Sequence, residues 1–183
     1  MPRKLKLQVQ LSVDGFIAGP NGEMDWMIFD WDEPLKQYVT ALTETVDCIL
    51  LGRKLAESFI PYWASHPGEE GAENINQTPK IVFSKTLTES PWVNTKLATG
   101  DLVAEVTQLK NETGKDIIVY GGANFISELI KYKLIDEFYL LVNPTLIGNG
   151  MAIFHDIPST QHLELKDTTG FQCGITVIHY ELK

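Results

Sequence analysis

Two adjacent glycines, Gly121 and Gly122, separate a run of β-branched residues from a segment with helical spacing in the stretch DIIVYGGANFISELI. A strand that ends in glycine and leads into a helix leaves backbone N–H groups free at the helix N-terminus, where the helix dipole favours a phosphate. A tight turn that needs a positive φ angle is the alternative explanation. The motif GxGxxG is absent, and Leu141 and Val142 stand where an NAD-binding fingerprint would carry its ribose-binding acid. A dinucleotide site therefore needs support from other residues.

Polar and cationic residues follow two further apolar strands. Gly52, Arg53 and Lys54 come after DCILL, and Ser84 and Lys85 come after PKIVF. Ligands gather at the carboxyl ends of strands in open α/β sheets, so these groups can share one edge with the glycine pair. Basic residues at strand ends are often solvated surface groups, but cations beside a backbone anion site suit a 2′-phosphate as well as a pyrophosphate. The combination favours NADPH over NADH.

These residues need a fold that brings several strand ends together, and the hydrophobic pattern predicts one. Apolar runs or period-two alternation predict strands at residues 4–11, 47–52, 79–84 and 116–122. Helical spacing begins at Glu33, and a helix capped by Asp101 and closed by Gly114 precedes the strand of the glycine pair. Alternation of apolar strands with helices predicts a largely parallel sheet that is covered on both faces.

The pattern changes after Asp136, where three strand-like stretches follow one another without a helix. They cover residues 137–148, 163–172 and 173–183, and they predict antiparallel strands at one edge of the sheet. Residues 62–79 are predicted to form a long polar loop, of a kind usually kept for function or disorder. No repeat and no linker divides the sequence, so we expect residues 1–183 to form a single domain.

The composition restricts the partners and the compartment. The chain has 183 residues, a net charge of −9 and 44% hydrophobic residues. An acidic chain is unsuited to a large nucleic-acid interface, and no apolar window reaches the roughly 18 residues that a membrane span requires. The N-terminus lacks the features of a signal peptide, so we expect a cytoplasmic protein. The histidines show no metal-binding spacing, and no metal site is expected.

Five stretches of the chain resemble a known family. The chain is similar to the RibD C-terminal family, which is the reductase domain of bacterial riboflavin biosynthesis within the dihydrofolate reductase superfamily, and in particular to its free-standing single-domain members. The matching stretches are QLSVDGFIAGPNGEMDW (10–26), ILLGRKLAESF (49–59), IVFSKTL (81–87), IIVYGGANFISELI (117–130) and LIDEFYLLVNPTLIGNGMAIF (134–154). The resemblance implies a homodimer with a dihydrofolate-reductase-like three-layer α/β fold. Its central sheet would be mainly parallel, with antiparallel C-terminal edge strands and helices on both faces.

The same resemblance implies NADPH as the cofactor and assigns positions around it. The glycine pair and the start of the following helix would face the pyrophosphate, and the cations after the other two strands would lie near the phosphates. The segment of residues 12–26 would cover the nicotinamide. The expected cofactor-binding residues are Ile17, Ala18, Gly52, Arg53, Lys54, Ser84, Lys85, Tyr120, Gly121, Gly122, Ala123 and Asn124.

Acidic residues in or after the covering segment are the candidates for a proton source. Hydride transfer from a nicotinamide needs a dry, shaped site and one proton on the substrate side. Asp14 is the first choice for a catalytic residue because SVDG matches the family, and an Asx-type turn is its alternative explanation. The acid that dihydrofolate reductases carry on a helix corresponds to Asp30 or Asp32. Trp26, Phe29 and Asp32 are expected to contact the substrate, although aromatic residues at such positions often belong to the core.

One departure from the family bears on the substrate. Residues 4–52 contain no arginine, and Lys36 is the cation nearest to the expected substrate side. A phosphoribosyl substrate is therefore less expected, and a neutral or carboxylated pterin-like or pyrimidine-like ring fits at least as well. The prediction is an NADPH-dependent reductase of a small heterocycle, similar to the aminouracil reductase of riboflavin biosynthesis and to dihydrofolate reductase. The alternative is an NADP(H)-binding protein whose catalytic activity is lost or changed.

Overall fold

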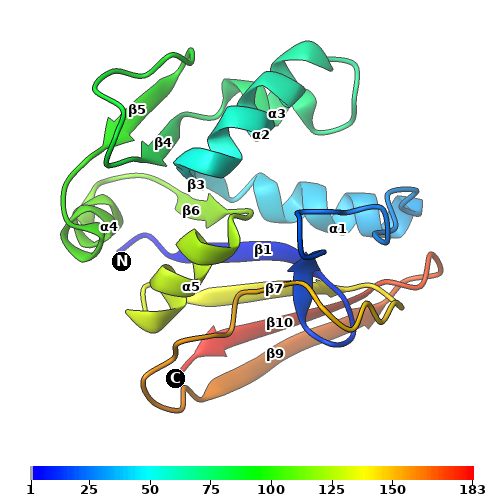
Figure 1. Ribbon diagram of the computed structural model, residues 1–183. Coiled ribbons are helices and arrows are strands. Elements are labelled where there is room, and N and C mark those ends of the chain that lie inside the picture. The colour runs from blue at the N-terminus through cyan, green and yellow to red at the C-terminus, as the bar shows by residue number, and fades with distance from the viewer. Residues whose placement is uncertain (1) are drawn as a thin grey trace.

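Eight strands form one sheet in the computed structural model, which describes residues 2–183 (Figure 1). Their order across the sheet is β5-β4-β3-β6-β1-β7-β10-β9, so β1 lies at the centre. The strands of this sheet are β1 (Leu5–Leu11), β3 (Val46–Gly52), β4 (Lys80–Phe83), β5 (Thr95–Ala98), β6 (Asp116–Val119), β7 (Glu137–Val142), β9 (Leu163–Gly170) and β10 (Thr176–Leu182).

The sheet is parallel except at its C-terminal edge. Every neighbouring pair from β5 to β7 is parallel. Strand β10 runs antiparallel to both β7 and β9. The predicted combination of a mainly parallel sheet with antiparallel C-terminal strands is therefore confirmed.

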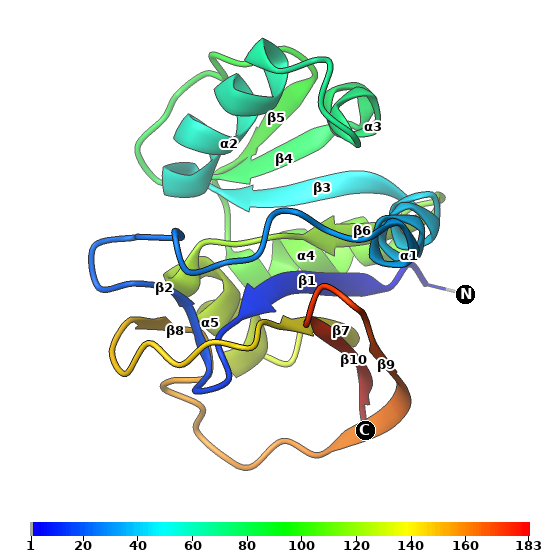
Figure 2. The ribbon, with the colours of Figure 1, turned by 90° about the vertical axis from the view of Figure 1, so that its right-hand side faces the viewer.

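Helices cover both faces of the sheet and give three layers. On one face, α1 and α2 pack over the strands, and on the other face α4 and α5 do so (Figure 2). Within residues 2–183, no helix is both long enough and apolar enough to cross a membrane. The helices are α1 (Glu33–Thr43), α2 (Arg53–Ser65), α3 (Ala72–Gln77), α4 (Leu102–Asn111) and α5 (Ala123–Lys131).

Strand β1 has one apolar and one polar face, as period-two alternation predicts. Leu5 and Leu7 are fully buried in the core beneath α4 and α5. The alternate residues Lys6 and Gln8 face the side of α1 and are also buried. The middle of the sheet therefore carries polar side chains under α1, where the hydrophobic pattern alone would place a core.

Two expectations about the connections were wrong. Residues 62–79 are not one long loop, because α2 continues to Ser65 and α3 follows. The short α3 ends at Gln77, and buried Lys80, the first residue of β4, donates from Nζ to the carbonyl oxygens of Ile75 and Thr78. Helix α4 ends at Asn111, earlier than the expected closing residue Gly114.

The carboxyl ends of three adjacent parallel strands lie together. Strands β4, β3 and β6 are neighbours in that order, and they end at Phe83, Gly52 and Val119. The residues that follow them therefore meet at one edge, which we call the carboxyl edge. This confirms the predicted gathering of the three strand ends.

Candidate active site

Two helices begin at the carboxyl edge without a side-chain cap. Gly52 is the N-cap of α2 and Gly122 is the N-cap of α5, and neither helix start has a side-chain capping hydrogen bond. The strands that lead into them, β3 and β6, are neighbours in the sheet. The first N–H groups of both helices stay available, and two helix dipoles place their positive ends at the same edge. This arrangement favours an anion with several oxygen atoms.

The glycines at this edge are needed for conformation and for close packing. Gly122 has φ 87° and ψ 93°, a conformation that a side chain would resist. A Cβ atom at Gly52 would lie 3.0 Å from Cβ of Phe125, and one at Gly121 would lie 3.0 Å from Cδ2 of Leu55. The need for a positive φ is confirmed, while the contact of the glycine pair with a phosphate stays a prediction.

Three cations follow the ends of β3 and β4. Arg53 and Lys54 are the first residues of α2, and Lys85 comes two residues after β4. Nη1 of Arg53 lies 2.5 Å from Oε1 of Glu57, one turn further along α2. Lys54 and Lys85 are exposed to solvent. The carboxyl edge therefore carries local positive charge on a chain that is acidic as a whole.

Ser84 is more constrained than its place in the sequence suggests. It is buried, and its Oγ accepts hydrogen bonds from the backbone N–H groups of Thr86 at 3.2 Å and Leu87 at 3.0 Å. The side chain thus shapes the turn that presents Lys85. Its hydroxyl hydrogen can still be donated, so a contact with the adenosine phosphate stays a prediction.

Residues 12–26, which we call the cover segment, are docked on the chain that follows β7. Within this segment β2 (Phe16–Ala18) pairs with β8 (Met151–Ala152) in a separate two-stranded sheet. A Cβ atom at Gly150 would overlap the carbonyl oxygen of Ala18, so the two backbones touch there. Ile17 packs against the core. The predicted contact of Ile17 and Ala18 with a nicotinamide stays a prediction.

Asp14 fastens the cover segment to the same loop. Its Oδ2 accepts a hydrogen bond from the N–H of Gly148 at 2.7 Å, and its Oδ1 accepts one from the N–H of Ile147 at 3.3 Å. The Ser12 hydroxyl and these backbone groups lower the pKa of Asp14. A lowered pKa disfavours the protonated form that a proton donor needs. The predicted catalytic role stays a prediction, and the contacts favour a positioning role.

The expected substrate contacts divide into one structural acid and two aromatic residues. Asp32 is the N-cap of α1 and accepts hydrogen bonds from the N–H groups of Leu35 at 3.0 Å and Cys173 at 2.9 Å. These backbone hydrogen bonds lower its pKa. Trp26 donates from Nε1 to the carbonyl oxygen of Glu23. Their contact with a substrate stays a prediction.

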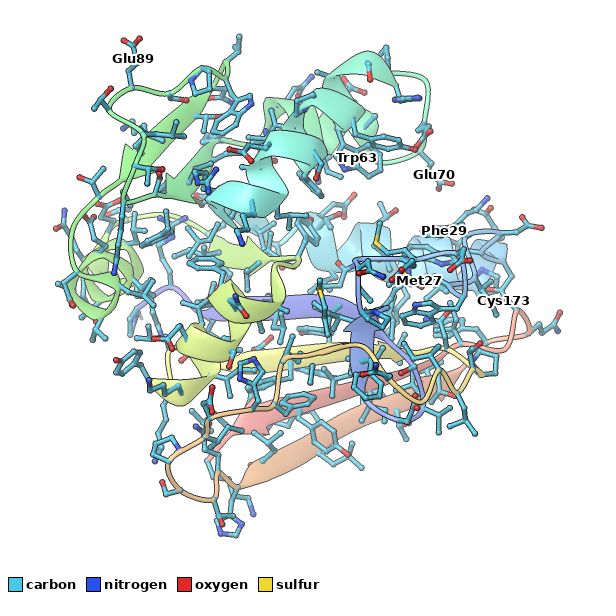
Figure 3. All side chains as sticks on the ribbon, viewed as in Figure 1. Met27, Phe29, Trp63, Glu70, Glu89 and Cys173 are labelled. Atoms are coloured by element: carbon cyan, nitrogen blue, oxygen red, sulfur yellow. The ribbon has the colours of Figure 1, made fainter. Side chains whose placement is uncertain are left out.

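Phe29 is 64% exposed and lies on the side of the site formed by the chain before α1. Figure 3 shows Met27 and Phe29 on this side and Trp63 and Glu70 on the side of α2 and the following loop. Nζ of Lys36 on α1 lies 3.4 Å from a carboxylate oxygen of Glu70, so an ion pair links the two sides. The sequence did not single out Trp63 or Glu70, because both lie in the segment that was predicted to be a loop.

An aromatic row from α2 reaches the end of β6. The ring of Phe59 stacks on the ring of Tyr120, with centroids 5.6 Å apart, and meets Trp63 edge-on. Burial raises the pKa of Tyr120, which keeps its hydroxyl neutral. Tyr120, which was expected from the sequence to lie near the cofactor, is therefore the last ring of the aromatic row and directly precedes the glycine pair.

Asn143 joins three parts of the site and was not predicted. It is fully buried at the end of β7. Its Oδ1 accepts a hydrogen bond from the N–H of Ile28 at 2.8 Å, and its Nδ2 donates to Oε1 of Gln10 at 3.0 Å. In the sequence, Asn143 is a single polar residue directly after an apolar strand, which could have marked it as a candidate. Its partners are too remote in sequence to be found from the pattern.

The family of the chain follows from a comparison with known sequences. The profile described as the RibD C-terminal domain matches residues 3–177. The chain belongs to this family. As a RibD C-terminal domain, it is similar to the uncharacterized proteins YyaP and YwjB of Bacillus subtilis (strain 168). YyaP is 33% identical, with 97% of this chain and 94% of that protein covered. YwjB is 28% identical, with 98% of each chain covered.

Solved structures support the same fold. A protein of Shewanella sp. PV-4 that is provisionally assigned to riboflavin biosynthesis superimposes with a TM-score of 0.78, at 25% identity, over 100% of this chain and 99% of that chain. The deaminase and 5-amino-6-(5-phosphoribosylamino)uracil reductase of Thermotoga maritima superimposes with a TM-score of 0.72, at 16% identity, over 100% of this chain and 57% of that chain. This RibD C-terminal domain thus has the dihydrofolate-reductase-like fold that the sequence predicted.

Proposed function

We propose that this chain is an NADPH-dependent reductase of a small, uncharged heterocycle. The observation that carries the proposal is the pair of uncapped helix N-termini beside three cations at the carboxyl edge. The N–H groups after Gly52 and Gly122 are suited to a pyrophosphate. The cations Arg53, Lys54 and Lys85 are suited to the additional 2′-phosphate that distinguishes NADPH from NADH.

The residues present fit such a cofactor. Neither α2 nor α5 has a side-chain cap at its start, so the first N–H groups of both helices can donate to the phosphates. A bound NADPH would supply the hydride. The chain would hold its phosphates at the carboxyl edge and exclude water with the cover segment. Asp14 would act on turnover by holding that segment in place.

The charges on the substrate side support an uncharged ring. No arginine lies between residues 4 and 52. Lys36, the one lysine of α1, forms an ion pair with Glu70. A phosphate would therefore have to compete with a carboxylate for a single ammonium group. Phe29 and Trp63 offer apolar surface for a flat ring instead.

A substrate screen tests this proposal. Oxidation of NADPH is followed by absorbance with pterins, dihydrofolate and aminopyrimidine ribosides, each riboside with and without a phosphate. We expect turnover with at least one unphosphorylated ring, and no advantage for the phosphorylated riboside. Strong preference for the phosphorylated riboside would contradict the assignment of an uncharged substrate.

The hydrogen bonds of Asp14 and Asp32 support one alternative function. In Asp14 and Asp32, both carboxylate oxygens accept hydrogen bonds from backbone N–H groups. An NADP(H)-binding protein without reductase activity would also have such an arrangement. NADPH binding without turnover across the whole screen would favour this alternative.

A further inference from the structure

The turn between α2 and α3 is closed by its own backbone hydrogen bonds. The N–H of Glu69 donates to the carbonyl oxygen of His66 at 3.1 Å, and the N–H of Ala72 donates to the carbonyl oxygen of Glu69 at 3.1 Å. Ala72 is fully buried, so it anchors the end of the turn. We call residues 66–71 the acidic turn, because it carries Glu69 and Glu70.

A tyrosine of α2 holds the acidic turn from the side of the helix. The hydroxyl of Tyr62 lies 2.7 and 3.0 Å from the two carboxylate oxygens of Glu69. A hydroxyl donates one hydrogen, so the two oxygens share it. The ring of Tyr62 also stacks on the ring of His66, with centroids 4.3 Å apart. Glu69 is therefore engaged with α2, and its neighbour Glu70 is the acid of the turn that reaches α1.

Glu70 pairs with α1 in a place that solvent can reach. Its carboxylate oxygen lies 3.4 Å from Nζ of Lys36, and the two side chains are 58% and 36% exposed. Figure 3 shows Glu70 at the end of the turn, on the side that faces α1. Exposed ion pairs contribute little to stability, so this pair can open for a competing ion. While it is closed, the carboxylate neutralises the ammonium group.

The two sides of the candidate site differ in their charge. The carboxyl edge carries three cations, whereas Lys36 is the one lysine of α1 and residues 4–52 contain no arginine. An anionic group of a substrate on the α1 side would therefore depend on Lys36, which Glu70 already occupies.

We propose that Glu70 determines the selectivity of the candidate site against anionic substrates, and that Tyr62 is a positioning residue that holds Glu70 opposite Lys36. This inference rests on the proposed function and names the residue that sets its substrate class. A carboxylate at this place repels a phosphate and competes with it for the ammonium group, which disfavours one class of ligand without any contact to the other. An uncharged ring is not affected by this competition.

Binding of two matched probes gives the first test. The probes are the aminopyrimidine riboside and its 5′-phosphate, titrated at equilibrium against the chain with NADP⁺ bound. Glu70→Gln should bind the 5′-phosphate at least about fivefold more tightly than the wild-type chain does, which corresponds to about 1 kcal/mol. Its affinity for the unphosphorylated riboside should stay within about twofold.

A neighbouring acid provides the matched control. Glu73 is an exposed residue in the first turn of α3, and its carboxylate accepts a hydrogen bond from Gln77. Glu73→Gln removes the same charge without freeing Lys36, so it should leave both affinities unchanged.

Two further variants test the route of the effect. The double variant Lys36→Met/Glu70→Gln should lose the gain for the 5′-phosphate, because the freed ammonium group is absent. Tyr62→Phe keeps the ring that stacks on His66 but removes the hydroxyl that holds Glu69. It should show a smaller gain in the same direction, while its affinity for NADPH stays unchanged. A merely structural role of Tyr62 would change the affinities for both probes alike.

The outcomes separate this inference from the proposed function. An unchanged ratio of the two affinities in Glu70→Gln overturns the inference, and so does an equal gain in Glu73→Gln or in the double variant. No binding of either probe below about 1 mM, in the wild-type chain or in Glu70→Gln, also overturns it while NADPH still binds. Tyr62→Phe without any gain overturns the positioning role. Loss of NADPH binding in the wild-type chain would instead contradict the proposed function itself.

Discussion

The carboxylates nearest to the proposed site are fixed by backbone hydrogen bonds. Asp14 holds residues 147 and 148, and Asp32 holds the start of α1 and Cys173. The sequence identified both acids, and for Asp14 it predicted a catalytic role, with a local Asx-type turn as the alternative. The partners of Asp14 are more than a hundred residues away, so no nearby pattern could reveal them. At this scale the backbone contacts of the two acids could not be predicted from the sequence, and their roles in the site stay predictions.

A substitution of Asp14 tests its positioning role. Asp14→Asn places an NH₂ group against backbone N–H donors and so loses one of two hydrogen bonds. We expect kcat to fall about 10²-fold, the cost of a misplaced cover segment, while NADPH affinity stays within about threefold. Steady-state kinetics and cofactor titration measure both quantities. An unchanged kcat would remove Asp14 from the mechanism.

The pH profile separates positioning from proton donation. Because the pKa of Asp14 is lowered, its carboxylate is ionised throughout the neutral range. As a positioning residue it should leave kcat independent of pH between about 6 and 8. A direct donor would be protonated in a fraction that falls tenfold per pH unit, and kcat would fall with it. Such a slope for the wild-type chain would restore Asp14 as the proton source.

At the scale of single elements, the helix starts were more predictable than the helix ends. Asp101 caps α4 as expected, with its Oδ1 accepting the N–H of Ala104 at 2.9 Å. Helix α3 was missed because its last carbonyl groups are satisfied by buried Lys80, which follows the helix and carries no recognised stop signal. An Asp cap at a helix start can be found from sequence, whereas a helix end that is satisfied by a lysine in the following strand has no such recognised pattern.

A charge at the start of α5 tests the anion site. Asn124 is an exposed residue of the first turn of α5. The negative charge of Asn124→Asp should interact favourably with the helix dipole and raise the free energy of unfolding by about 0.3–1 kcal/mol. The same charge should repel a pyrophosphate and weaken NADPH binding. Asn111→Asp adds an equal charge at the other end of the sheet and should leave NADPH binding unchanged. A stable Asn124→Asp variant with wild-type affinity would contradict the site.

The C-terminal strands carry an ion cluster that should respond to acid. Hydrogen bonds from Lys4 and then Lys166 lower the pKa of Glu181 from 4.5 to about 2. Because the folded-state pKa is the lower one, this group stabilises the fold above pH 4.5 and loses that effect as the pH falls towards about 2. Glu181→Gln should therefore flatten the acid limb of the stability curve, measured by urea unfolding between those pH values. An unchanged acid limb would show that other carboxylates dominate.

At the scale of the whole molecule, one eight-stranded sheet combines parallel strands, whose ends form the carboxyl edge, with two antiparallel strands at its C-terminal side. The parallel order and the antiparallel edge were predictable because apolar strands and helices alternate and then stop alternating. The small β2–β8 sheet was not, since its strands are very short and lie far apart in the chain. Contacts between remote segments thus account for most of what the sequence left open.

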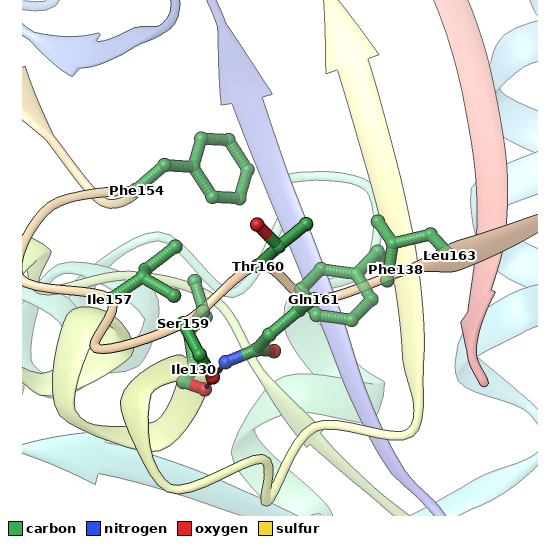
Figure 4. Close-up of a pocket in the computed structure, with 8 residues that line it drawn as sticks. All are labelled: Ile130, Phe138, Phe154, Ile157, Ser159, Thr160, Gln161 and Leu163. Carbon is green, nitrogen blue, oxygen red and sulfur yellow. Dashed lines mark hydrogen bonds between the residues drawn. The ribbon is translucent and has the colours of Figure 1, made fainter.

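The C-terminal strands carry an exposed apolar surface. Leu165 on β9 is 54% exposed and is the register partner of Tyr180 on β10. Leu163, two residues earlier on β9, lines a hollow of about 350 Å³ together with Phe138 and Phe154 (Figure 4). We propose that a second copy of the chain covers this surface.

Light scattering after gel filtration tests the homodimer. The wild-type chain should show about twice the monomer mass of 20.5 kDa, and Leu165→Lys should shift it towards the monomer, because a buried charge destabilises an apolar interface. Val93→Lys is the matched control, since Val93 is 91% exposed and lies between β4 and β5, far from this surface in the sheet order. A monomeric wild-type chain would contradict the proposed dimer.

The cofactor preference tests the central claim most directly. Titration should show that NADPH binds at least about tenfold more tightly than NADH, a difference of about 1.4 kcal/mol. Arg53→Gln should remove most of this preference, and Glu57→Gln, which frees Arg53 from its ion pair, should keep or increase it. Equal affinities of the wild-type chain for NADPH and NADH would contradict the account.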